Sequence, residues 1–157
     1  MKTVQKTLRL RDPRYLAPTM TVEAARGILG MDEDEVAEAV DDGKLVAWDI
    51  GADGERRREL RILTESVARM SEPDAAPITG PEACALVATG DKPWITGREM
   101  ARALCCSGTH IIKLIEVGDL ALVPGTVIKR GKEGTPRITR ASVGAFLRGR
   151  MEGGYSE

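Results

Sequence analysis

The polar side chains best suited to specific hydrogen bonding in this 157-residue chain lie between positions 107 and 113. Ser107, Thr109, His110 and Lys113 supply two hydroxyls, an imidazole and an amine, and the apolar residues among them would form the opposite side of a helix. Hydroxyls and imidazole can bond to the edges of nucleic-acid bases, and an amine can bond to a phosphate. The segment therefore predicts a helix that contacts DNA through these four side chains.

A metal site or a catalytic centre is the alternative that Cys105, Cys106 and His110 raise. Adjacent cysteines rarely bind one ion with good geometry, and a structural zinc site needs four ligands. A single histidine, without a clear Ser/His/Asp or paired-carboxylate arrangement, restricts acid–base chemistry. The turns at 51–54 and 131–134 lack the Lys-Ser/Thr pair of a phosphate-binding loop. We therefore expect no enzyme activity, no catalytic residues, no metal and no cofactor.

Residues 95–120 supply the two helices that would position these groups. Thr96 followed by Glu99 has the spacing of a capping box, which predicts the start of a helix. Residues 105–108 interrupt the apolar pattern, and Gly118 ends the second helix at a C-cap position. Two helices joined by so short a turn meet at a steep angle, which is the helix-turn-helix arrangement.

The same pattern occurs earlier in the chain, so the sequence contains an internal repeat. The matched pairs at an offset of 75 residues are Thr21 with Thr96, Leu29 with Leu104, Gly43 with Gly118, and Leu45 with Leu120. The matched pairs at an offset of 76 are Arg61 with Arg137, Ile62 with Ile138, and Val67 with Val143. The extra residue falls in a predicted hairpin loop, where length changes are tolerated. Each copy is predicted to contain a helix, a turn, a second helix, a β-hairpin and a final helix.

The repeat divides the chain into five segments. The predicted organisation is an N-terminal arm at 1–19, a first repeat at 20–70, a linker at 71–94, a second repeat at 95–150 and a tail at 151–157. The linker is rich in proline and glycine, although it has room for a short helix after Thr79. The predicted fold class is α+β, mainly α, with two tandem winged helix-turn-helix domains in which the β-hairpin is the wing.

The matched residues resemble those of the MerR/excisionase superfamily of small winged-helix DNA-binding domains. The resemblance is carried by residues 21–30 and 42–45 in the first copy, by residues 96–104 and 117–120 in the second, and by the post-wing segment 138–147. The pattern is more specific for the fold than for one member of the superfamily. The resemblance implies a function in transcription regulation, in the excision of phage and other mobile elements, or in phage DNA packaging.

Charge distinguishes the two repeats. Residues 95–157 carry ten basic and six acidic side chains, whereas residues 1–70 carry twelve and fourteen. Besides the four residues of the second helix, the predicted DNA-contacting residues are Arg98, Arg102, Lys129, Arg130, Lys132 and Arg137. The first two precede the second helix of the pair, which we call the groove helix because it would lie in a DNA groove. The others belong to the wing, from which cations can reach the phosphate backbone. We therefore assign DNA binding to the second repeat.

The first repeat carries an acidic helix where a groove helix would lie. Residues 32–42 hold seven carboxylates and no cation, so phosphate would repel this helix. The candidate protein-interaction residues are Asp32, Glu33, Glu35 and Glu38, and an ordinary solvated face is the alternative. The run Arg56, Arg57 and Arg58 in the predicted wing leaves open a secondary contact with DNA.

The favoured function is sequence-specific binding of double-stranded DNA in the regulation of transcription or of site-specific recombination. The alternative is a protein-interaction adaptor that no longer binds DNA, which the net charge of −1 and the acidic helix favour. One such module buries only about 600–1,000 Å² on DNA, which suggests a homodimer or cooperative assembly on the duplex. Three cysteines and the lack of an apolar leader or bilayer-spanning run predict a cytoplasmic protein without a membrane partner. The predicted DNA binding places it at the nucleoid.

Overall fold

The computed structural model describes residues 17–52, 59–72, 74–126 and 136–152. Over these ranges the chain is α+β, with seven helices, two small antiparallel sheets and roughly half of the residues in helices. The elements are β1 (Thr19–Thr21), α2 (Val22–Leu29), α3 (Glu33–Asp41), β2 (Ala47–Asp49), β3 (Leu60–Leu63), α4 (Thr64–Arg69), α5 (Gly80–Val87), β4 (Trp94–Thr96), α6 (Gly97–Ala103), α7 (Gly108–Glu116), β5 (Arg137–Thr139) and α8 (Arg140–Arg150). None of these helices combines the length and apolar character needed to cross a bilayer.

The strand pairings repeat along the chain with the offsets found in the sequence. In the first sheet, of order β1-β3-β2, Thr19 lies opposite Leu63. In the second sheet, Trp94 of β4 lies opposite Thr139 of β5, which are the positions 75 and 76 residues further on. The same offsets relate two further pairs, Ala47 with Ile62 and Leu122 with Ile138. The internal repeat is therefore a repeat of strand register as well as of sequence.

Four of the helices begin with a side-chain cap at matched positions of the two repeats. The backbone N–H of Glu99 donates to the Thr96 hydroxyl, which confirms the predicted start of α6. The other caps are Thr21 for α2, Asp32 for α3 and Ser107 for α7. Each repeat thus forms a pair of helices whose starts are fixed locally by residues that the sequence supplies.

The turn inside each helix pair requires a left-handed backbone conformation. Gly30, which ends α2, has φ +66°, and Cys105, 75 residues later, has φ +52°. Glycine adopts this conformation without steric cost, whereas a residue with a Cβ atom is strained by roughly 1–2 kcal/mol. The second repeat therefore makes the same turn as the first with a strained residue.

The strain at Cys105 predicts opposite effects for two matched substitutions. Gly30→Ala should lower the free energy of unfolding by about 1 kcal/mol, because a Cβ atom there meets nothing within 4 Å and only the backbone is strained. Cys105→Gly should leave that free energy unchanged or raise it by up to about 1 kcal/mol. Glycine relieves the backbone strain in the folded chain, but it also increases the conformational entropy of the unfolded chain, which offsets part of the gain. Urea denaturation of the full chain measures both. Clear destabilisation by Cys105→Gly would contradict the assignment of strain.

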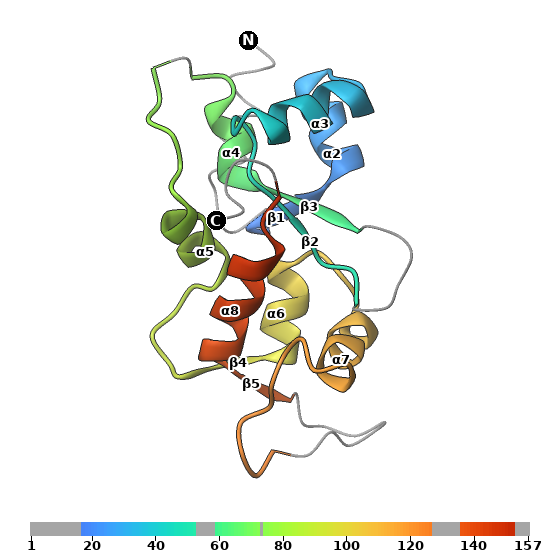
Figure 1. Cartoon of the computed structure of the whole chain (residues 1–157), viewed down its shortest axis with the longest axis vertical. Coiled ribbons are helices and arrows are strands. Elements are labelled where there is room, and N and C mark those ends of the chain that lie inside the picture. Colours follow the sequence, from blue (N-terminus) through green and yellow to red (C-terminus); the bar gives the residue numbers. More distant parts are fainter. Residues whose placement is uncertain (1–16, 53–58, 73, 127–135, 153–157) are drawn as a thin grey trace.

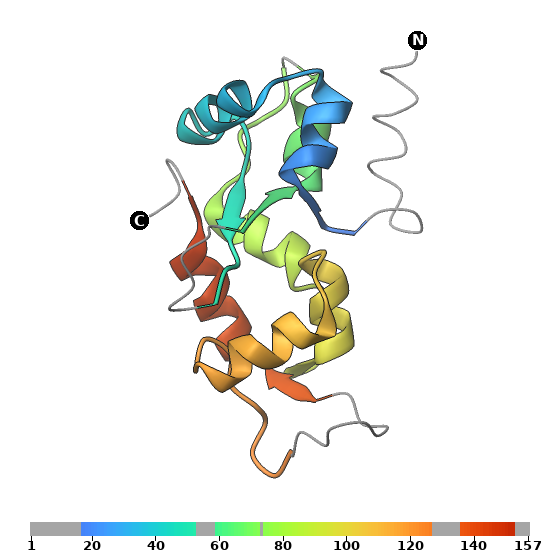
Figure 2. The ribbon, with the colours of Figure 1, turned by 90° about the vertical axis from the view of Figure 1, so that its right-hand side faces the viewer.

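The three-stranded sheet is buried on both faces. Along β2 and the residues before it, Leu45 and Ala47 pack in the hydrophobic cluster formed with α2, α3 and α4. Val46, Trp48 and Ile50, which alternate with them, pack in the cluster formed with α5 to α8. Figure 1 and Figure 2 show the sheet between the two groups of helices. Trp48 of β2 is completely buried.

The segment 71–94 takes part in this packing. Its helix α5 follows the N-cap Thr79, which confirms the short helix predicted there. Ala83 and Val87 of α5 are buried in the same cluster as α8, and Ile78 is 5% exposed. The polypeptide between the two repeats therefore fills part of the core that the second repeat shares with the first sheet.

Candidate nucleic-acid interface

Helix α7 presents one exposed face and buries the opposite one. Ile111 and Leu114 are buried, while Thr109 and Lys113 lie among the exposed residues. The exposed face continues to Val117, which follows the helix and is 43% exposed. Thr109 and Lys113 thus have the accessibility that the predicted groove contacts require.

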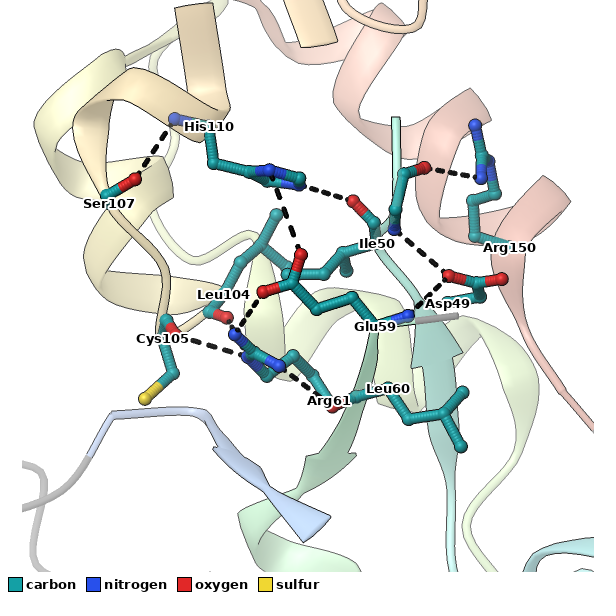
Figure 3. A network of polar contacts seen from close by, with 11 residues as sticks. Asp49, Ile50, Glu59, Leu60, Arg61, Leu104, Cys105, Ser107, His110 and Arg150 are labelled. Atoms are coloured by element: carbon teal, nitrogen blue, oxygen red, sulfur yellow. Dashed lines mark hydrogen bonds and ion pairs between the residues drawn. The ribbon is translucent and has the colours of Figure 1, made fainter. Parts of the chain in front are cut away.

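Ser107 and His110 have contacts within the chain. The Ser107 hydroxyl accepts a hydrogen bond from the backbone N–H of His110 at 3.1 Å and so caps α7. The His110 side chain is 12% exposed, and its Nε2 lies 2.5 Å from the carbonyl oxygen of Ile50. Its Nδ1 lies 3.8 Å from a carboxylate oxygen of Glu59 (Figure 3). His110 therefore forms a contact between α7 and the end of the β2–β3 hairpin, and its proposed contact with a base stays a prediction.

A network of polar contacts fixes this end of the hairpin. The Asp49 carboxylate accepts hydrogen bonds from the backbone N–H groups of Gly51, at 3.0 Å, and Glu59, at 3.2 Å. Arg150, at the end of α8, donates to the Gly51 carbonyl at 2.9 Å (Figure 3). Arg150 also forms an ion pair with Asp119 at 2.9 Å. The hairpin of the first repeat is thus attached to both α7 and α8 of the second.

The predicted phosphate contacts are only partly within the described ranges. Arg98 and Arg102 are exposed on α6, and Arg102 also lines a groove of about 480 Å³ between α5, α6 and the start of β1. Arg137 is exposed at the start of β5, where its guanidinium lies 4.8 Å from the ring centre of Trp94. The remaining candidates, which the sequence assigns to the two predicted wings, lie outside the described residues: Lys129, Arg130, Lys132, Arg56, Arg57 and Arg58.

The acidic helix is exposed along the face that corresponds to the exposed face of α7. Asp32 and Glu35 form a reciprocal capping box at the start of α3, which places both carboxylates in structural contacts. Glu33 and Glu38 are exposed, and the position of Glu38 corresponds to that of Lys113 at the offset of 75. Two equivalent helix faces therefore carry opposite charges at the same position.

The cysteines near α7 differ in accessibility. Cys105 is exposed in the turn, whereas burial raises the pKa of the Cys106 thiol to about 11 against a smaller opposing effect of Arg61. Burial also raises the pKa of Cys84 on α5. In the part of the chain that the structure describes, no group of three or more histidine, cysteine, aspartate or glutamate side chains is placed to hold a metal ion.

Comparison of this chain with models of protein families, with curated proteins and with solved structures found no match.

The different burial of the two adjacent thiols predicts different reactivity. At pH 8 a thiol of pKa about 11 is ionised in roughly one molecule in a thousand, so Cys106 should react far more slowly than Cys105 with a thiol-specific disulfide reagent. Cys105→Ser should remove the fast phase of labelling in the folded chain, and Cys106→Ser should retain it. A fast phase that survives in Cys105→Ser and disappears in Cys106→Ser would show that Cys106 is the accessible thiol.

Proposed function

We propose that this chain is a tandem winged helix-turn-helix protein that binds double-stranded DNA through α7. The exposed face of α7, with Thr109 and Lys113, is the observation that carries the proposal. Its hydroxyl and amine can bond to base edges and phosphates, and the exposed arginines 98, 102 and 137 on α6 and β5 add positive charge to the same repeat. In both repeats a short strand precedes a helix pair, and an antiparallel partner of that strand leads into a further helix. This repeated order supports the winged-helix interpretation.

The comparison between repeats supports the assignment of DNA binding to the second. At the position of Lys113, α3 carries Glu38, and at the position of Thr109 it carries Asp34, both exposed. A carboxylate placed against phosphate is repelled, whereas an amine attracts it and releases counterions. We propose that the second repeat contacts the groove and that α3 faces away from the duplex or toward a protein partner.

The described ends of the first hairpin lie against α7 of the second repeat. Ile50 and Glu59, on either side of residues 53–58, both lie against His110 of α7. Residues 53–58 join these two positions in the sequence and include Arg56, Arg57 and Arg58. We therefore propose that these arginines contact the DNA bound by α7, rather than a separate site of the first repeat.

The biological role proposed for this binding is regulation of transcription or of site-specific recombination in the nucleoid. Sequence specificity is tested by enrichment of bound fragments from a pool of random-sequence duplexes. A single module has a footprint of about 600–1,000 Å², so we propose a homodimer or cooperative assembly on the target. One protein bound per isolated site at full affinity would remove the need for assembly.

Neutralising the cations of the second repeat tests the DNA-binding surface. The combined substitution Lys113→Gln, Lys129→Gln, Arg130→Gln and Lys132→Gln should weaken binding to short duplexes by roughly tenfold or more. It should also flatten the slope of log affinity against log salt by about 0.9 for each phosphate that the protein no longer neutralises. Fluorescence anisotropy over a salt series measures both quantities. Unchanged affinity and unchanged salt dependence would reject the proposal.

A matched control is available in the first repeat. Glu38→Gln and Asp41→Asn change the positions that correspond to Lys113 and Glu116, so they alter charge on the equivalent helix face. Under the proposed function, this double variant binds DNA with the wild-type salt slope. The adaptor alternative predicts instead that the wild type shows no salt-dependent affinity for DNA, and that the double variant loses a protein partner that binds α3.

Substitution of the first hairpin tests whether both repeats contribute to one surface. Arg56→Gln, Arg57→Gln and Arg58→Gln together should weaken DNA binding and flatten the salt slope by up to about 0.9 for each arginine that contacts phosphate. The same anisotropy measurement checks this, with Arg69→Gln on α4 as a control that removes one positive charge remote from α7. A salt slope identical to that of the wild type would place these arginines outside the interface.

A further inference from the structure

The carbonyl groups at the end of α6 receive hydrogen bonds from the first repeat. The Thr19 hydroxyl of β1 donates to the Ala103 carbonyl at 2.7 Å. Nε of Arg61 on β3 donates to the carbonyls of Leu104, at 2.9 Å, and Cys105, at 3.1 Å. The last carbonyls of a helix have no partner within the helix itself. Side chains 43 or more residues away in the sequence therefore complete the turn between α6 and α7.

Arg61 is buried where it binds these two carbonyl groups. The residue is 8% exposed, and its guanidinium also donates to the Leu60 carbonyl, at 2.9 Å, and to the Glu59 carboxylate, at 3.0 Å (Figure 3). Burial of a cation is unfavourable unless hydrogen bonds and opposite charge compensate it, and here both are present. The positive charge also lies at the C-terminal end of α6, where the helix dipole is negative.

The equivalent arginine of the second repeat has a different environment. Arg137, 76 residues after Arg61, lies at the same place in the strand register, opposite Thr96 as Arg61 lies opposite Thr21. Arg137 is exposed and lies over the ring of Trp94. The fold of a single repeat therefore does not require a buried arginine at this position. Arg61 is buried because the helix pair of the second repeat lies against it.

We infer that Arg61 is a positioning residue for the DNA-binding surface, an inference that rests on the proposed function. Only the short segment 104–107 connects α6 to α7, and the two carbonyls that Arg61 binds belong to this segment. Holding these carbonyls fixes the direction in which α7 leaves the turn. The contact of His110 with Ile50 is a second attachment of α7 to the same hairpin. The first repeat thus orients the groove helix of the second.

Arg61→Gln in the full chain tests this inference with two measurements. Hydrogen exchange should accelerate by roughly tenfold or more at the amides of Cys105 and Cys106, which bond to the carbonyls of Arg102 and Ala101. The corresponding amides of Gly30 and Met31 in the first repeat should keep wild-type exchange. DNA affinity should fall by about tenfold with an unchanged salt slope, because Arg61 contacts no phosphate.

Two further variants are compared with Arg61→Gln, one that removes a donor to the same helix end and one that removes an arginine elsewhere. Thr19→Val removes one donor to the same helix end with little change of volume, and should produce a smaller effect in the same direction. Arg69→Gln removes an arginine that forms ion pairs with Glu65 and Glu82, and should leave exchange at Cys105 and Cys106 unchanged. Unaltered exchange at the α6–α7 turn in Arg61→Gln would overturn the inference. Absence of DNA binding by the wild type would instead reject the proposed function, and the exchange result would then decide the positioning role alone.

Discussion

Burial of both faces of the β1-β3-β2 sheet is the constraint on which the rest of the structure depends. Leu45 and Ala47 fill one core while Val46 and Trp48 fill the other, so a strand of a few residues serves two hydrophobic clusters. A sheet covered on both faces needs a nearly continuous apolar run, which residues 45–48 supply. The two repeats consequently share this sheet, and the hydrophobic core of each is incomplete without it.

The shared sheet determines where the polar side chains of the β2–β3 hairpin lie. Because the sheet rests against α6 and α7, the hairpin places Arg61 at the end of α6 and Glu59 beside His110. The contacts with Ile50 and Glu59 occupy the His110 imidazole, the one group on α7 whose ring nitrogens can both donate and accept hydrogen bonds. The surface proposed for DNA is therefore narrower than the polar side of the helix, and it rests on Thr109, Lys113 and the surrounding cations.

The two helix pairs share one backbone plan and differ in the charge of their exposed faces. The caps, the left-handed turn residues and the strand register are kept at matched positions, because each satisfies backbone groups locally. Glu38 and Lys113 are not among these capping and turn residues, and they differ in the sign of their charge. The two repeats therefore differ on the exposed faces of α3 and α7 rather than in their backbone plan.

The sequence alone determined the repeat, its offsets, the helix pairs, and the caps at Thr96 and Thr79, since these follow from local hydrogen bonding and apolar periodicity. It missed the short strands β1 and β4, each of three residues, and it did not anticipate the contact of His110 with Ile50. Only the tertiary structure decided the roles of Arg61 and His110. Both side chains bind carbonyl groups more than 40 residues away, and nothing in their immediate sequence distinguishes them from exposed residues such as Arg137.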